Sequence, residues 1–390
     1  MRGYFKAIIT MLLLFVTDAI HAQKGLDYLR SEEHLSNMDF KNKNYQESKN
    51  HCINIINYYT YNKKQCLKNN ESASIVFNSF YSLGVISDFI DITNNERIYF
   101  LKEALSMCEN NKELLSSFEN KYNIVTLYQL YANFMLEQDK SFDVSHILDK
   151  MIKYGETYCK ADINDILLTA ASVYSVAQQF EKNYLIYQQL YGNFKDLDNQ
   201  QKYETLKELI FFEFKKKNYT QIISYAENNK NLICRTNDEA KESTLYFIIS
   251  AYNKVAIEYE STAKRTNDYS ACNKTYIVGY DYAKQSKAKC LPFIIINRAY
   301  SLYLQTLYKS KAIELFEEYI NCALMALTNK DEEMLKYFIV EDLQQAFISI
   351  ILNTSIEKTT QIKNEYDSVI STFHLTDKGE YSKDLKLLFD

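Results

Sequence analysis

Residues 163–178 read INDILLTAASVYSVAQ, and the spacing of their apolar side chains predicts an amphipathic helix. The apolar positions recur at steps of three and four: Ile163, Ile166, Leu167, Ala170, Ala171, Tyr174 and Ala177. A second stretch with a similar register follows at residues 181–197. Two amphipathic helices separated by a few residues predict an antiparallel helical hairpin.

The same two-helix pattern is found about eight times along the chain, with polar residues at the breaks. The predicted hairpins cover residues 27–60, 72–109, 113–158, 163–197, 199–232, 238–289, 292–328 and 331–374. One hairpin cannot bury its own apolar face, so several must stack to form a continuous core. Because no linker or low-complexity stretch interrupts the pattern, we expect residues 23–390 to form a single helical repeat array.

Glycine and proline are scarce, with 7 Gly and 1 Pro in 390 residues. Sheet proteins need many tight turns with positive φ, for which glycine is the usual residue. Such a composition therefore favours an all-α fold made of long helices and short polar loops. The single proline, Pro292, is predicted at the first turn of a helix, where its missing N–H costs nothing.

The stretch from Lys309 to Tyr319 resembles the second helix of a tetratricopeptide repeat, with Ala312 as the small residue and Phe316 as the aromatic residue. Residues 180–190 are similar, and Leu83-Gly84 resembles the first-helix signature. The chain departs from the family because it has no Trp and lacks the later proline, so another type of α-solenoid remains an alternative. The resemblance implies a right-handed superhelical α-solenoid whose concave face binds a protein or peptide.

The resemblance also implies which side chains line the concave groove. In this family they lie three residues before, one after and five after the small residue of each first helix. One repeat then gives Asn297, Ser301 and Gln305. A second repeat, with Ile210 as the small residue, gives Lys207, Phe211 and Lys215.

The N-terminus predicts a cleaved signal peptide. Arg2 and Lys6 precede an apolar run at residues 7–16, and Ala19-Ile20-His21-Ala22 has the small-residue spacing of a cleavage site. We expect cleavage after Ala22 and a periplasmic or secreted mature protein. An uncleaved anchor is the alternative, but Asp18 ends the run well short of the roughly 20 apolar residues that a span needs. No later stretch is apolar enough to predict a membrane span.

The eight cysteines have two interpretations that the sequence leaves open. They are either buried free thiols, which pack as small apolar residues, or disulfides of an oxidising compartment. Several lie near the predicted ends of second helices, so bridges Cys108–Cys159 and Cys234–Cys290 are the most plausible pairings. There is no C-x-x-C motif and the histidines are scattered, so the sequence predicts neither a metal site nor a cofactor.

No catalytic motif is present, and we expect the chain not to be an enzyme. Cys52 follows His51 directly, but neighbours on a helix do not face each other, so Cys52 is predicted to be core. Acidic pairs such as Glu32-Glu33 are predicted to be solvated helix faces. The net charge of −5 argues against nucleic acid as a partner.

The predicted function is therefore an exported binding scaffold for a protein or peptide partner. Two alternatives are a glycan-capture component of a nutrient-uptake system and a sensory or regulatory input module. The 34 tyrosines are compatible with either groove lining or helix–helix packing.

Overall fold

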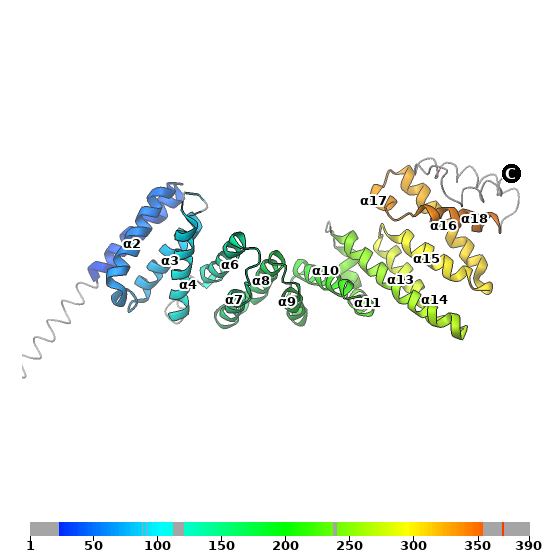
Figure 1. Ribbon diagram of the computed structural model, residues 1–390, viewed down its shortest axis with the longest axis horizontal. Helices are drawn as coiled ribbons and strands as arrows, with labels where there is room; N and C mark the ends of the chain where they lie inside the picture. Colours follow the sequence, from blue (N-terminus) through cyan, green and yellow to red (C-terminus); the bar gives the residue numbers. More distant parts are fainter. Residues whose placement is uncertain are drawn as a thin grey trace, which may run out of the picture. The chain divides into compact units, whose positions relative to one another are not determined.

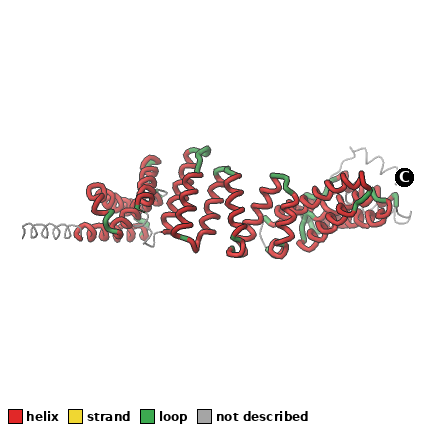
Figure 2. Tube along the Cα trace, turned by 90° about the horizontal axis from the view of Figure 1, so that it is seen from below, coloured by secondary structure: helices red, strands yellow, loops and turns green. Residues whose placement is uncertain are grey.

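The structure is a computed structural model, and it describes residues 23–353 except 88, 91, 112–120 and 237–239, together with residue 369. Within these residues every regular element is a helix and no strand occurs, which confirms the predicted all-α class (Figures 1 and 2). The predicted signal peptide at residues 1–22 lies outside the described residues, as does much of the last predicted hairpin.

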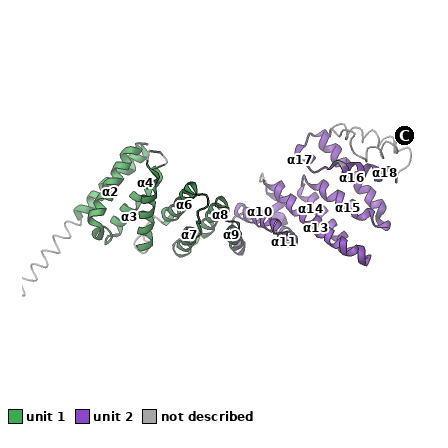
Figure 3. Ribbon diagram, in the orientation of Figure 1, with its two compact units in different colours: residues 1–190 green, residues 191–390 purple. Residues whose placement is uncertain are grey.

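The chain divides into two compact units, residues 1–190 and 191–390 (Figure 3). Unit 1 starts, in its described part, with a helix through residues 23–41. The helices that follow are α2 (Tyr45–Cys66), α3 (Asn70–Ile86), α4 (Asn94–Asn110), α6 (Lys121–Gln138), α7 (Ser145–Tyr158), α8 (Ile163–Val176) and α9 (Phe180–Gly192), which ends just past the boundary.

Unit 2 contains both long and short helices. Its α-helices are α10 (Asn199–Lys215), α11 (Tyr219–Asn228), α12 (Lys230–Arg235), α13 (Lys241–Thr266), α14 (Ser270–Ser286), α15 (Leu291–Tyr303), α16 (Lys309–Thr328), α17 (Glu332–Leu335) and α18 (Val340–Ile351). In the described residues, short 3-10 turns at 160–162 in unit 1 and at 194–196 and 306–308 in unit 2 connect neighbouring helices.

Consecutive helices pack against each other as hairpins, for example α6 with α7 and α13 with α14. The first helices of successive hairpins are also in contact: α3 with α6 and α6 with α8 in unit 1, and α10 with α13 and α13 with α15 in unit 2. This is the stacking expected of a helical repeat protein, in which each hairpin covers the apolar face of the next. Most predicted hairpin boundaries agree with the observed helices to within a few residues.

The residues predicted to sit where helices approach are buried. Ala312 and Phe316 are fully buried in α16, and Gly84 in α3 is covered as well. A Cβ built on Gly84 would lie 2.5 Å from a methyl carbon of Leu101 in α4. The glycine at position 84 therefore allows α3 and α4 to pack closely.

The turns use residues other than glycine. Six described residues have positive φ, none of them glycine, and each follows the end of a helix: Lys43, Gln178, Lys217, Asn267, Lys287 and Lys330. In five of the six, the N–H of the residue after the left-handed one donates to the carbonyl four residues before the left-handed one. At Lys217, for example, the N–H of Asn218 donates to the Glu213 carbonyl at 2.9 Å. This is the hydrogen bond of a Schellman motif, which normally places glycine at the left-handed position.

A candidate binding cleft in unit 1

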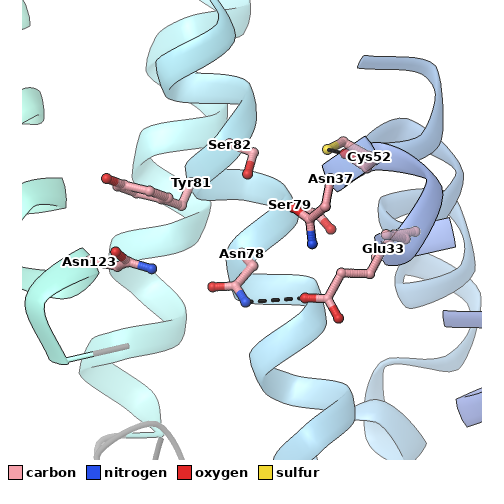
Figure 4. Close-up of a pocket in the computed structure, with 10 residues that line it drawn as sticks. Glu33, Asn37, Cys52, Asn78, Ser79, Tyr81, Ser82 and Asn123 are labelled. Carbon is pink, nitrogen blue, oxygen red and sulfur yellow. Dashed lines mark hydrogen bonds between the residues drawn. The ribbon is translucent and has the colours of Figure 1, made fainter. Parts of the chain in front are cut away.

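A polar cleft of about 180 Å³ opens in unit 1, on the side formed by the helix at 23–41, α3 and α6 (Figure 4). We call this side the first-helix face, because each of the three is the first helix of its hairpin. The residues lining the cleft are Glu33, Ser36, Asn37, Cys52, Ile55, Asn78, Ser79, Tyr81, Ser82 and Asn123. All but Cys52 and Ile55, which belong to α2, come from these three helices.

Hydrogen bonds hold the helix at 23–41 in place beside its neighbours. Arg30 donates to both carboxylate oxygens of Glu71 in α3, at 2.6 and 2.8 Å. On the α2 side, the His51 ring contacts the Glu32 carboxylate at 2.9 Å and the Asp39 carboxylate at 3.5 Å. The cleft is thus bounded by helices that are tied together at two points.

The centre of the cleft is a carboxylate–amide contact. Nδ2 of Asn78 donates to Oε1 of Glu33 at 3.2 Å across the gap between the two helices, and Asn78 lies between Glu33 and Asn123 (Figure 4). Burial raises the pKa of the Glu33 carboxyl, and the nearby Glu71 charge adds to the rise, whereas the Asn78 hydrogen bond lowers it. Glu33 was predicted to be a solvated helix face, and the structure corrects this: α3 and α6 stack over its side of the helix.

Cys52 forms part of the floor and is 2% exposed, so the prediction that it is a core residue is confirmed. Its thiol lies 3.1 Å from the Ser36 hydroxyl. Burial raises the pKa of the Cys52 thiol to about 11, which keeps it protonated at neutral pH. The floor is therefore a packed surface, and amides, hydroxyls and the Glu33 carboxylate provide the polar chemistry above it.

The first set of predicted groove residues lies in unit 2, with Asn297 and Ser301 on α15 and Gln305 just after it, and two of the three are buried. Ser301 is 1% exposed and contacts the Cys272 thiol of α14 at 3.4 Å. Gln305 is 8% exposed and exchanges two hydrogen bonds with Asn273, at 3.0 and 3.2 Å. Asn297 is half-buried and donates to a carbonyl one turn earlier in its helix. Ser301, near the end of α15, and Gln305, in the loop after it, thus contact α14 and do not line an exposed groove.

The groove residues predicted on α10 are more accessible. Lys207 is half-buried and pairs with Glu204 at 2.8 Å. Lys215 is exposed, and its ammonium lies 5.3 Å from the centre of the half-buried Phe211 ring. Phe211 belongs to a chain of ring contacts that crosses α10, α13, α15 and the loop after α17: Phe211, Phe214, Phe247, Tyr246, Phe293 and Tyr337.

All eight cysteines are free thiols in the structure, so neither Cys108–Cys159 nor Cys234–Cys290 is bridged. Seven of the eight are buried, and burial raises the pKa of every one of the eight thiols. Among the described residues, no group of His, Cys, Asp and Glu side chains is arranged to hold a metal ion. None of the described helices combines the length and apolarity that crossing a membrane requires.

The sequence contained one signal for the cleft that the groove prediction did not use. The rule applied above to α10 and α15 assigns Tyr81 when Gly84 is the small residue, and Tyr81 does line the cleft. The same rule also assigns Val85 and Phe89, which do not. Glu33 and Asn123 have no such signal, because they reach the cleft only through the stacking of separate hairpins.

Comparison with known proteins leaves the chain without a family. No family model matches it, and no curated protein matches its sequence. Two solved structures of the nuclear import adaptor Nro1, one described as from S. pombe, are similar to it at 12% and 11% identity and a TM-score of 0.28. They cover 83% and 85% of this chain, and the matches span 93% and 100% of theirs. A circular tandem repeat protein is similar at 11% identity and a TM-score of 0.23, over 90% of this chain and 96% of its own. Likeness at this level carries no argument about function, and the helical repeat fold rests on the structure itself.

Proposed function

We propose that the chain is an exported, non-catalytic scaffold of the tetratricopeptide-like type, and that its cleft in unit 1 holds part of a protein or peptide partner. One observation carries the proposal: side chains from three successive first helices converge on one polar cleft. Hydrogen-bonding groups gathered in a concave site are typical of recognition surfaces. Because the three helices belong to different hairpins, only the stacked array assembles the cleft.

The chemistry of the lining supports binding over catalysis. A nucleophile needs a nearby base or a lowered pKa. The thiol in the floor, Cys52, has its pKa raised to about 11, and its polar contact is the hydroxyl of Ser36. The amides of Asn37, Asn78 and Asn123 are hydrogen-bonding groups that orient a ligand without transferring protons.

Site-specific photocrosslinking tests the scaffold proposal. A photoreactive amino acid is placed at Asn37 or Ser82, which line the cleft, and, as the control, at Lys102, an exposed position on α4. The variants are expressed in the cells that make the protein natively. We expect one partner to crosslink from both cleft positions and not from Lys102. Equal crosslinking from all three positions would contradict the proposal.

Export needs a separate test because residues 1–22 lie outside the described residues. We expect the protein isolated from native cells to be in the envelope or medium fraction. Mass spectrometry of its N-terminal peptide should show a chain that begins at Gln23, after cleavage at Ala22. An intact N-terminus on a protein found only in the cytosol would refute export and leave the cleft proposal standing.

A further inference from the structure

The residues that line the cleft carry a negative charge and no positive charge. Among the residues that line it, Glu33 is the one charged side chain, and there is no Lys, Arg or His. The charged group that acts on the Glu33 carboxyl most directly is Glu71, which is also negative. Arg30 lies nearby but is paired with Glu71 and does not line the cleft. A half-buried carboxylate that no cation in the cleft faces costs free energy unless a ligand supplies the positive charge.

The amide of Asn78 also has an acceptor atom without a hydrogen-bond donor. A carboxylate can only accept hydrogen bonds, so the contact with Glu33 requires Asn78 to present its Nδ2 there. This fixes the orientation of the amide and turns Oδ1 away from Glu33. Oδ1 of Asn78 is buried and has no hydrogen-bond partner among the described residues. A buried acceptor left without a donor is uncommon and costly.

The Glu33 carboxylate, which lacks a counter-charge in the cleft, and Oδ1 of Asn78, which lacks a donor, are both acceptors. Glu33 and Asn78 stand on opposite sides of the gap, with Asn37 above it and Asn123 beyond Asn78 (Figure 4). A ligand that complements Glu33 must donate a hydrogen bond and carry positive charge. Phosphate, sulfate or a free carboxylate would be repelled by the Glu33 charge.

The size of the cleft narrows the choice of ligand. Its volume of about 180 Å³ is below the roughly 300–1,000 Å³ of sites for drug-sized molecules, so it suits a single side chain. A guanidinium is planar and prefers to bind both oxygens of one carboxylate, but Asn78 already occupies Oε1 of Glu33. An ammonium is a compact charge with diverging donors, and it can bind the one oxygen of Glu33, Oε2, that Asn78 does not contact.

We propose that the cleft recognises the ammonium group of a lysine side chain on the partner. This inference rests on the proposed function, because it names the feature by which the scaffold would select its peptide. The Glu33 carboxylate supplies the charge, and its Oε2, which Asn78 does not contact, accepts a hydrogen bond from the ammonium. The half-buried Tyr81 ring, on the same wall, covers the methylene stem.

Binding of small lysine analogues to the full chain tests this directly. The probes are Nα-acetyl-lysine methylamide and the same molecule acetylated on Nε, which loses its charge but keeps its stem. Saturation-transfer NMR and titration suit the weak affinity expected of one side chain. We expect the free amine to bind and Nε-acetylation to weaken binding at least tenfold. No binding of the amine, or equal binding of both probes, overturns the inference.

Two variants locate the binding. Glu33→Gln keeps the size of the side chain and removes its charge, and it should weaken binding of the amine at least tenfold. Glu47→Gln removes an exposed carboxylate of α2 that does not line the cleft, and it should leave binding unchanged. Circular dichroism checks that both variants are folded. If Glu33→Gln is folded and binds as well as the unaltered chain, the lysine assignment is wrong.

The outcomes separate this inference from the scaffold proposal. If photocrosslinking from Asn37 and Ser82 persists while the lysine probes fail to bind, the scaffold stands and the lysine assignment falls. If the lysine probes bind in the cleft but crosslinking shows no preference for it, the cleft is an amine site and the scaffold proposal falls.

Discussion

The left-handed residue after α8 offers a sharp test of how this chain manages without glycine. Gln178 has φ 56°, and the following N–H, of Gln179, donates to the Tyr174 carbonyl at 3.0 Å. A residue with a Cβ pays about 1–2 kcal/mol for this conformation, whereas glycine does not. Glycine loses about 0.4–1 kcal/mol more to backbone entropy on folding. The Gln178 side chain is exposed, so little contact is lost. We expect Gln178→Gly to stabilise the protein by about 0.5–1 kcal/mol.

The matched control is one residue earlier. Ala177 is the C-cap of α8 with φ −72°, where glycine gains nothing from its freedom. Ala177→Gly should therefore destabilise by about 0.5–1 kcal/mol. Urea unfolding followed by far-UV circular dichroism measures both, and the two midpoints should move in opposite directions without a change in slope. If both variants are destabilised equally, the left-handed conformation at residue 178 is not a source of strain.

Further expectations concern close packing, burial of charge and the thiols. Gly279→Ala should destabilise the protein by about 1–2 kcal/mol, because its Cβ would lie 2.5 Å from a methyl carbon of Ile294 in α15. In the same urea assay, Gly192→Ala should be neutral or mildly stabilising, because a Cβ there would have no atom within 4 Å. The raised pKa of Glu33 means that the folded state favours its protonated form, so its contribution to stability is present below the unfolded pKa and is lost as pH rises through the folded pKa. Glu33→Gln should therefore raise the unfolding midpoint at pH 7 and have less effect near pH 4; a pH-independent difference would contradict this account. Without reductant, all eight thiols should react with Ellman's reagent in urea and the seven buried ones should react slowly in the folded protein; fewer than eight in urea would reveal bridges.

The two units differ in the side chains that dominate these regions. Unit 1 offers a polar cleft centred on one carboxylate, whereas the ring contacts from Phe211 to Tyr337 run across three helices of unit 2. Most of these rings pack against one another and are half-buried, so much of their surface is used within the fold. This is the helix-packing role that the sequence left open for its many aromatic residues.

Local pattern in the sequence was enough to predict the helices and their pairing. The spacing of apolar residues at 163–178 predicts which face of that helix is apolar. This pattern depends only on residues three or four positions apart. The scarcity of Gly and Pro favoured an all-α fold over sheet-rich ones. Even so, composition did not reveal that residues such as Lys217 and Asn267 would adopt the left-handed conformation themselves.

Tertiary structure alone decided which polar residues meet. Glu33, Asn78 and Asn123 are separated by more than forty residues at each step, and nothing in their local sequence marks them as neighbours. Likewise, the burial of Ser301 depends on the rotation of α15 against α14, which a one-residue change of register alters by about 100°. Apolar periodicity is a property of single helices and is therefore written in the sequence. The cleft arises from the way whole hairpins stack, so its lining could be seen only in the folded chain.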